Sequence, residues 1–506
     1  MLTQRARLAA LLALMGLFQP LSVGAMEQVT TITQFSDVKP TDWAYQALSS
    51  LVERYGCVAG YPQGSFGGNR EISRFEAAAL LNACLDRVSE TTDELRRLLK
   101  EFENELASLR GRSDGLSKRI GTQEAQQFSA TTKLSGSATF VIGGSAFSGT
   151  ASALVDQAQA VFGATTFNYD LQLNFDTSFN GRDLLRTTLR GGNFDVIANS
   201  FGGGGPSSLS QLEVAFQQED GSDIVGIDRL YYQLPLGEFT VTVGGRVGQD
   251  DMLALWPSVY PDSTVLDALT LNGAPLAYNK NLGAGAGLWW KTKGWSVSAS
   301  YVAANAANSA ATAGGIGTEA SASSATLQLG YQQEQWGAAF LYSAVQNGAA
   351  TYGTNALMNA LNTNTGPNLT QAFALSAYWQ PARAGWIPSI SAGWGLNSTS
   401  YSQPQPAGTP TLSQSWSVGL QWLDAFATGN AAGMGFGQAP MVTAQSGNIP
   451  ANDSNWMWEW WYKFQISDGI SITPALFYLV RPLGQDTPAG LSFNQLGVLV
   501  KTSFQF

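Results

Sequence analysis

The stretch FNYDLQLNFD, residues 167–176, alternates strictly between apolar and polar side chains. One face of an extended strand carries Phe167, Tyr169, Leu171, Leu173 and Phe175. The other face carries Asn168, Asp170, Gln172, Asn174 and Asp176. This period of two predicts a β-strand with an apolar environment on one side and water on the other.

The same alternation recurs from about residue 130 to the last residue, with turn residues between the segments. The clearest apolar faces are Trp336, Ala338, Phe340 and Tyr342; Phe373, Leu375, Ala377 and Trp379; Trp416, Val418, Leu420 and Trp422; and Trp456, Trp458, Trp460, Tyr462 and Phe464. Repeated strands with aromatic residues near their ends are typical of a transmembrane β-barrel with aromatic girdles.

A soluble β-sandwich is the alternative, because its strands also alternate between two faces. A sandwich of this size would normally divide into several domains, but no linker interrupts residues 129–506. The polar faces are also too polar and too extensive for a sandwich core. We therefore predict an antiparallel transmembrane β-barrel of about 16 strands, a size that encloses an aqueous channel.

The final stretch GVLVKTSFQF, residues 497–506, has the same pattern. We expect Phe504 and Phe506 to face lipid, and Lys501 to face the lumen together with Ser503 and Gln505. This strand is expected to pair with the strand near residues 134–142, because closure leaves no free sheet edge.

Composition excludes several classes of function. The net charge of -10 argues against a nucleic-acid partner. The chain has no His, so catalytic triads, Cys-His dyads and His-ligated metal sites are absent. We therefore predict no enzyme activity, no catalytic residues, no cofactor and no metal site.

The first residues have the pattern of a signal peptide. Arg5 and Arg7 precede an apolar stretch, Leu8 to Phe18, and a small-residue site follows at residues 23–25. A membrane anchor is the alternative, but this stretch is shorter than the ~20 residues that span a bilayer. We predict a signal peptide over residues 1–25 and a short linker over residues 26–34.

Residues 35–88 have helical patterning around a turn-rich centre. Within them, FSDV, a Trp-Ala pair, GYPQGSF and ISRFE resemble the surface-layer homology (SLH) domain in order and spacing. The resemblance implies binding to peptidoglycan-linked polysaccharide through Trp43, Ser73, Arg74 and Glu76. Phe75 departs from the commonest family motif, and a single copy implies that oligomerisation supplies avidity.

Both cysteines of the chain, Cys57 and Cys84, lie in this unit. Because an exported protein meets oxidising conditions, we predict a disulfide between them. Two buried free thiols in a small helical core are the alternative.

Residues 89–128 are predicted to form a periplasmic coiled coil. A three-four alternation runs through Leu85, Val88, Thr92, Leu95, Leu99, Phe102, Leu106, Leu109, Ser113, Leu116, Ile120, Gln123 and Gln127. Such a seam favours a coiled coil, although a surface helix packed on a domain is an alternative. The seam implies an oligomer and does not choose between dimer and trimer; a homotrimer is our expectation.

Strand parity also suggests which charges line the lumen. In residues 181–194, Arg186 and Arg190 share one face of a strand, although the arginine spacing also fits a helical stripe. Similar parity places Arg229 and Arg246 inward, because charges facing lipid are costly. We hypothesise a basic wall of these four arginines, opposed by Asp250 and Asp251 on an inward loop. The alternative is that some of them lie at the barrel rim.

The terminal aromatic strand resembles the outer-membrane β-signal, with Phe504 and Phe506 in the aromatic positions. Residues 459–482, EWWYKFQISDGISITPALFYLVRP, and the preceding DAFATGNAAGMGFGQAP, residues 424–440, resemble the OprB family of carbohydrate-selective porins. The whole arrangement resembles cyanobacterial outer-membrane porins, some of which are named iron-uptake porins.

This resemblance implies an outer-membrane porin whose SLH domain and coiled coil lie in the periplasm. It implies passive diffusion of small hydrophilic solutes and inorganic ions, with iron and sugars as candidates. The partners implied are outer-membrane lipid and peptidoglycan-linked polymer. A structural tether between membrane and wall, with secondary transport, is the alternative function.

Overall fold

The computed structural model describes residues 131–349, 352–362 and 366–506. The predicted signal peptide, SLH domain, disulfide and coiled coil lie outside these described residues. Among the described residues, no helix is long and apolar enough to cross a membrane.

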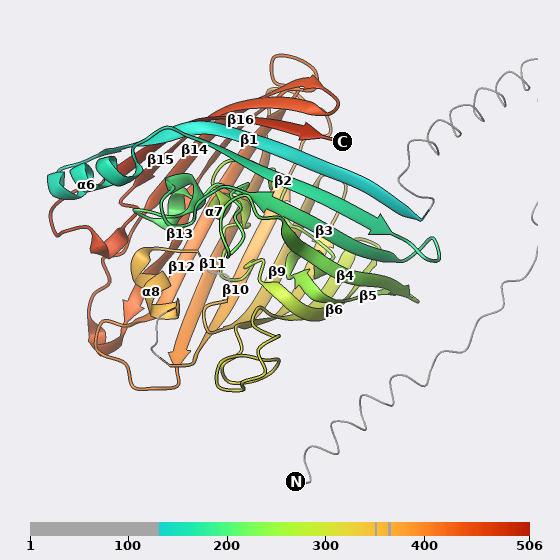
Figure 1. The fold of residues 1–506 in the computed structure, drawn as a ribbon, viewed down its shortest axis with the longest axis horizontal. Coiled ribbons are helices and arrows are strands. Elements are labelled where there is room, and N and C mark those ends of the chain that lie inside the picture. Colours follow the sequence, from blue (N-terminus) through green and yellow to red (C-terminus); the bar gives the residue numbers. More distant parts are fainter. Residues whose placement is uncertain (1–130, 350–351, 363–365) are drawn as a thin grey trace, which may run out of the picture. The chain divides into compact units, whose positions relative to one another are not determined.

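The described part of the chain is a closed antiparallel barrel of sixteen strands (Figure 1). The strands are β1 Thr132–Ser148, β2 Thr166–Thr177, β3 Leu184–Gly192, β4 Gly226–Leu236, β5 Phe239–Gly248, β6 Leu282–Thr292, β7 Trp295–Ala303, β8 Ser323–Gln332, β9 Trp336–Gln346, β10 Asn368–Trp379, β11 Ser389–Tyr401, β12 Pro410–Leu423, β13 Ala431–Gln445, β14 Trp456–Ser467, β15 Ile470–Val480 and β16 Asn494–Gln505. The predicted barrel and its strand number are confirmed.

The barrel closes where β16 pairs with β1. Val141 of β1 lies opposite Lys501 of β16, and both side chains are buried inside the barrel. On the outer face, the Phe140 and Phe504 rings lie 6.1 Å apart between centroids. The last residue, Phe506, exchanges two backbone hydrogen bonds with Gly136, of 2.8 and 3.1 Å. The predicted closure and the two predicted faces of β16 are therefore confirmed.

The two ends of the barrel differ in their connections. Residues 237–238, 293–294 and 468–469 are tight turns at one end, which we call the short-turn end. β1 begins and β16 ends there. The opposite end carries long loops, which include the helices α6 Ser152–Phe162 and α8 Asn355–Asn362. This asymmetry is typical of outer-membrane barrels, whose short turns face the periplasm.

Aromatic residues gather on the outer face of β7 to β10, close to the short-turn end. Trp295 and Trp336 are the first residues of β7 and β9, and Trp379 is the last residue of β10. The Tyr331 ring lies between Trp295 and Trp336, with centroid distances of 4.8 and 5.4 Å. Amphipathic rings at this position form the belt that lies at the lipid headgroups.

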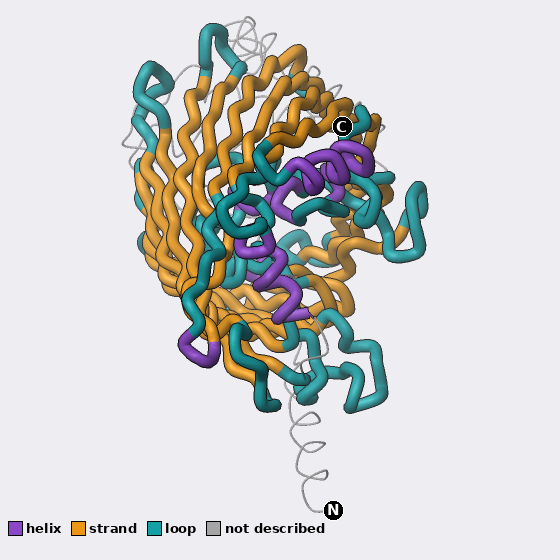
Figure 2. Tube along the Cα trace, turned by 90° about the vertical axis from the view of Figure 1, so that its left-hand side faces the viewer, coloured by secondary structure: helices purple, strands orange, loops and turns teal. Residues whose placement is uncertain are grey.

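The loop between β5 and β6, residues 249–281, folds into the barrel; we call it the inward loop. It contains the short helix α7 Asp267–Thr270, and its Leu266, Leu276 and Tyr278 are fully buried. Figure 2 shows helices and loops within the ring of strands. The lumen is therefore partly filled by the inward loop, which carries Asp250 and Asp251.

Small side chains on the inner wall make room for the inward loop. A Cβ at Gly393 of β11 would collide with the backbone carbonyl of Asn272, and one at Gly419 of β12 would collide with the Tyr260 ring. Inward serines bind the loop directly: Ser376 Oγ donates to Asn272 O at 2.9 Å, and Ser415 Oγ donates to Gly273 O at 2.9 Å. The many Gly and Ser residues of the second half thus have a structural cause.

An apolar core inside the barrel joins the inward loop to the loop between β3 and β4. That second loop spans residues 193–225, and we call it the companion loop. Its Phe201 and Leu209 pack with Leu266 of the inward loop and with Phe477 of β15. Burial of these apolar side chains holds both loops against the wall.

Candidate solute pathway

The inner face of β2 and β3 carries two ion pairs. Arg186 binds Asp176 through two hydrogen bonds of 2.8 and 2.7 Å. Arg190 binds Asp170 in the same two-pronged way, at 2.7 and 3.1 Å. The register places Asp176 directly opposite Arg186, so strand pairing sets this geometry. Such paired hydrogen bonds between guanidinium and carboxylate fix both side chains.

Arg190 is further held by an aromatic ring. Its guanidinium carbon lies 4.3 Å from the centroid of the Phe216 ring, which belongs to the companion loop. A guanidinium over a ring face gains a cation–π attraction. The charge of Arg190 is thus directed to one carboxylate and one ring.

Arg229 of β4 is surrounded by carboxylates. It binds Asp228 at 2.8 Å and Asp251 at 2.7 Å, and its Nη2 lies 3.9 Å from Asp250. Asp250 and Asp251 begin the inward loop, as predicted, but they contact the arginine instead of facing it across the lumen. Burial, reinforced by the neighbouring charge of Asp250, raises the pKa of Asp251 to about 6.

The predicted inward position of Arg246 is wrong. Between Gly244 and Val247, β5 has one residue more than its partner β6, which is a β-bulge. The bulge places Arg246 opposite Leu230, whose side chain is on the outer face, while Gly244 lies opposite the inward Tyr231. Arg246 therefore does not join Arg186, Arg190 and Arg229 on the inner wall.

The central segment of the inward loop is tied to β14 by Glu459, which is fully buried. One carboxylate oxygen accepts from the Tyr260 hydroxyl at 2.6 Å, and the other accepts from the Leu266 backbone N–H at 2.7 Å. Trp461 Nε1 also donates to the Tyr260 hydroxyl, at 2.9 Å. These contacts hold both ends of the segment 260–266.

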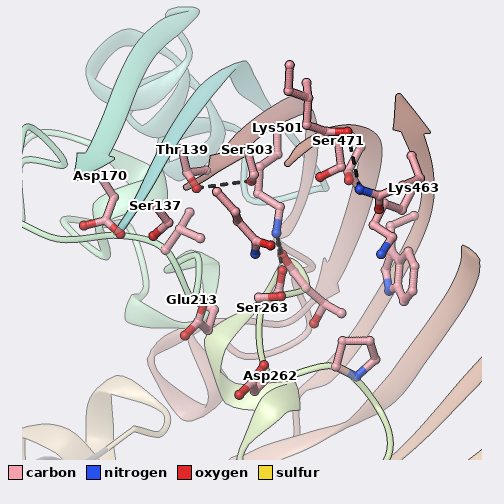
Figure 3. A pocket seen from close by; sticks show the side chains of 18 of the residues that line it. Ser137, Thr139, Asp170, Glu213, Asp262, Ser263, Lys463, Ser471, Lys501 and Ser503 are labelled. Atoms are coloured by element: carbon pink, nitrogen blue, oxygen red, sulfur yellow. Dashed lines mark hydrogen bonds between the residues drawn. The ribbon is translucent and has the colours of Figure 1, made fainter. Parts of the chain in front are cut away.

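Lys501 of β16 holds the middle of the same segment. Its ammonium donates to the Ser263 carbonyl and, at 2.9 Å, to the Thr264 carbonyl. In Figure 3 the Lys501 side chain extends from the strand wall toward Ser263. This strand-to-loop contact fixes the position of the neighbouring Asp262.

The companion loop pairs with the inward loop. An antiparallel bridge joins Leu212 to Leu266, and the Glu213 N–H donates to the Val265 carbonyl at 3.0 Å. Glu213 and Asp262 therefore project from two adjacent segments. In Figure 3 both lie on the loop side of a cavity, across from Asp170 and Thr139 of the strand wall. Burial raises the pKa of Glu213 to about 7.

Open space remains between these loops and the inner wall. One cavity of about 340 Å³ is lined by both loops and by β1, β2, β12, β14, β15 and β16. A second cavity of about 540 Å³ is lined by both loops and by β2, β3 and β4. The two cavities share Gln172, Glu213 and Asp262. Of the predicted lumen residues, Arg186, Arg190, Arg229, Asp250 and Asp251 line the larger cavity, and Arg246 does not.

Several residues of this site were not among the predicted ones. Strand alternation places Asp170 and Asp176 on the polar face of β2, so a sequence signal for them existed, and it also predicts that Lys501 faces the lumen. Glu213 and Asp262 lie in loops without periodicity, and nothing in the sequence indicates that these loops meet. The predicted wall-binding residues Trp43, Ser73, Arg74 and Glu76, like Cys57 and Cys84, lie outside the described residues.

Comparisons with known proteins agree with this architecture. Residues 34–78 match the S-layer homology domain. The chain is 34% identical to the uncharacterized protein alr4550 of Nostoc sp. over 95% of this chain and 86% of that one. It is 32% identical to the outer membrane protein SlpA of Thermus thermophilus over 23% of this chain and 14% of that one.

Among solved structures, OprB of Pseudomonas putida aligns with a TM-score of 0.48 and 11% identity, covering 76% of this chain and 96% of the other. Residues 89–506 match the carbohydrate-selective porin, OprB family, and this match includes the segment predicted as a coiled coil. With its SLH domain and its sixteen-stranded barrel, the protein is an outer-membrane porin that belongs to the OprB family.

Proposed function

We propose that this porin is a passive diffusion channel for small hydrophilic solutes and inorganic ions. The observation that carries the proposal is the open, largely polar space between the loops and the inner wall, with cavities of about 340 and 540 Å³. A lumen lined by polar and charged groups admits hydrated solutes, and its width and charges select among them. The family and the fold indicate a channel rather than an enzyme.

Sugars and iron are the two candidate solutes. The family description supports sugars, and the resemblance to cyanobacterial porins named for iron uptake supports iron. Both fit a passive pathway lined by hydroxyl, amide and carboxylate groups. Their relative rates are a question for transport measurements.

Liposome swelling tests the diffusion channel. Vesicles that contain the folded full chain are diluted into isotonic solutions of a pentose, a disaccharide or a large dextran. We expect swelling that slows with increasing solute size and that is absent with dextran. Vesicles with heat-unfolded protein are the control. Swelling no faster than in these control vesicles would reject the channel.

We further propose that the N-terminal part binds the porin to peptidoglycan-linked polymer, with Trp43, Ser73, Arg74 and Glu76 at the binding site. The SLH match over residues 34–78 supports this anchoring. We expect the full chain to sediment with purified wall sacculi and Arg74→Ala to bind several-fold less, because guanidinium groups bind anionic polymers strongly. Arg383→Ala, at an exposed position of the barrel, is the matched control. Equal binding of both variants would remove Arg74 from the site.

A structural tether is the second candidate function, and the SLH match also favours it. The two experiments separate the candidates. A tether predicts sedimentation with sacculi and no solute-dependent swelling, whereas an anchored channel predicts both.

We also propose that three copies assemble through the heptad seam that begins at Leu85. The seam supports an oligomer, because its two positions in seven are too narrow a stripe for packing against a domain. Light scattering of the detergent-solubilised chain measures the assembly. The mass of three copies is expected, and the mass of one or two copies would contradict the trimer.

A further inference from the structure

The place where the two cavities meet is defined by three side chains. Gln172 of β2 projects from the strand wall, and Glu213 and Asp262 project from the paired loops. Hydrogen bonds hold the backbone that carries the two carboxylates: the Glu213 N–H donates to the Val265 carbonyl, and Lys501 donates to the carbonyl of Ser263, the residue after Asp262. A solute that moves between the cavities passes these groups.

The arginines of the inner wall do not present free positive charge there. Arg186 and Arg190 each bind a carboxylate through two hydrogen bonds, and Arg229 is surrounded by three carboxylates. Lys280 lies 3.8 Å from Asp267. Each of these cations is thus neutralised by a carboxylate of its own.

Glu213 and Asp262 differ from the other carboxylates that line the larger cavity. Within the part of the chain that the structure describes, neither has an ion-pair partner within the 4.0 Å that defines the other pairs. The larger cavity is lined by six carboxylates and four cationic groups, so its charge is net negative. The carboxylates are Glu213, Asp228, Asp250, Asp251, Asp262 and Asp267, and the cations are Arg186, Arg190, Arg229 and Lys280.

Two lysines act in the opposite direction in the smaller cavity. Lys463 and Lys501 both line it, on the side of β14 and β16. The Lys501 ammonium is directed to the carbonyls of Ser263 and Thr264, which reduces its exposure to a passing ion. The free carboxylates at the shared edge therefore face both cavities, whereas the two lysines face one.

We propose that Glu213 and Asp262 are the residues that make this channel prefer small cations to anions. The inference rests on the proposed diffusion channel and gives its ion class. Fixed charges at a narrow passage with low-dielectric walls raise the local concentration of oppositely charged ions and repel like charges. The sequence predicted a basic wall in the lumen. We infer instead that the two carboxylates shared by the cavities determine the ion preference.

The test is the reversal potential of the folded full chain in planar bilayers under a tenfold KCl gradient at pH 8. We expect cation preference in the unchanged protein. In the double variant Glu213→Gln, Asp262→Asn the ratio of potassium to chloride permeability should fall by roughly a factor of three. Asp156→Asn, an exposed carboxylate of α6 outside both cavities, is the matched control and should behave like the unchanged protein.

A second variant keeps the test decisive if the double variant does not fold. Gln172→Lys adds a positive charge at the same edge and should also lower the permeability ratio. Anion preference in the unchanged protein, or an unaltered ratio in either folded variant, would overturn the inference while the channel itself stands. A folded protein without conductance would instead reject the proposed diffusion channel, and the inference with it.

Discussion

At the scale of single residues, ion pairs between arginines and carboxylates determine how much positive charge the inner wall presents to the lumen. Strand parity placed Arg186, Arg190 and Arg229 inward, and in the structure all three line the larger cavity. Parity did not reveal that each guanidinium has carboxylate partners within hydrogen-bond distance. In the fold, Arg186 and Arg190 each form an ion pair with one carboxylate, and Arg229 is surrounded by three. The three arginines therefore form no basic wall, and the carboxylates without partners determine the local charge.

The pH dependence of ion preference follows from Glu213. Burial raises its pKa to about 7, and the charges that act on it are Lys280, Asp267, Arg190 and Lys501. Because a carboxylate is mostly negative only above its pKa, cation preference should be weaker at pH 5 than at pH 9 and should strengthen as the pH rises through 7. Reversal potentials between pH 5 and pH 9 measure this change.

Glu213→Gln is the control for this profile and should remove the step near pH 7. A smaller step near pH 6 should remain, because the pKa of Asp251 is raised to about 6. A flat profile in the unchanged chain would contradict the role of Glu213.

At the scale of elements, the inward loop depends on one buried carboxylate. Glu459→Gln leaves a single acceptor for two donors, the Tyr260 hydroxyl and the Leu266 N–H. An unsatisfied buried donor costs about 1–3 kcal/mol. We expect the free energy of unfolding in urea to fall by about this amount.

The same Glu459→Gln variant should give noisier single-channel currents, since residues 260–266 lose an anchor. Glu334→Gln, at an exposed short turn, is the matched control. Unfolding curves and currents that match those of the control would show that Glu459 does not hold the loop.

The two faces of the strands should differ in how well they tolerate an added charge. Leu171 lies near the middle of β2 on the outer face, and Ser137 of β1 lies on the inner face beside the smaller cavity. An arginine facing the bilayer midplane costs about 2–4 kcal/mol, whereas one facing a wet lumen costs little. Leu171→Arg should therefore lower the unfolding free energy in lipid vesicles by about this amount, and Ser137→Arg should not. Equal losses would contradict the assigned faces.

The position of a side chain could be predicted from the sequence where the residue belongs to a regularly alternating strand. Alternation placed residues 167–176 and 497–506 correctly, because side-chain direction in a strand is set by the backbone. It failed at Arg246, where the bulge after Gly244 shifts the parity by one; the Gly244–Gly245 pair is the signal for such a bulge. Glu213 and Asp262 are brought together by packing between two loops, which no local pattern records.

The positions of the loops explain why several residues of the inner wall are Gly or Ser. In the structure, Gly393, Gly419 and Ser376 are small because the inward loop packs directly against them. Small side chains on the inner wall thus mark the places where the inward loop packs against the strands.

At the scale of the whole molecule, the closed sheet is the basis of function. Pairing of β1 with β16 satisfies every strand edge, so the barrel can lie in lipid while its lumen stays polar. β1 begins at the short-turn end, where outer-membrane barrels face the periplasm. The SLH match over residues 34–78 precedes β1 in the sequence.

Single-channel conductance of the full chain in planar bilayers tests the central claim, passive diffusion, most directly. Protein first shown to be folded by its heat-dependent mobility in detergent gels is added to one side, and current is recorded at several KCl concentrations. We predict discrete steps whose conductance rises in proportion to salt and whose current is linear with voltage near zero. Folded, inserted protein that gives no steps at any salt concentration would contradict it.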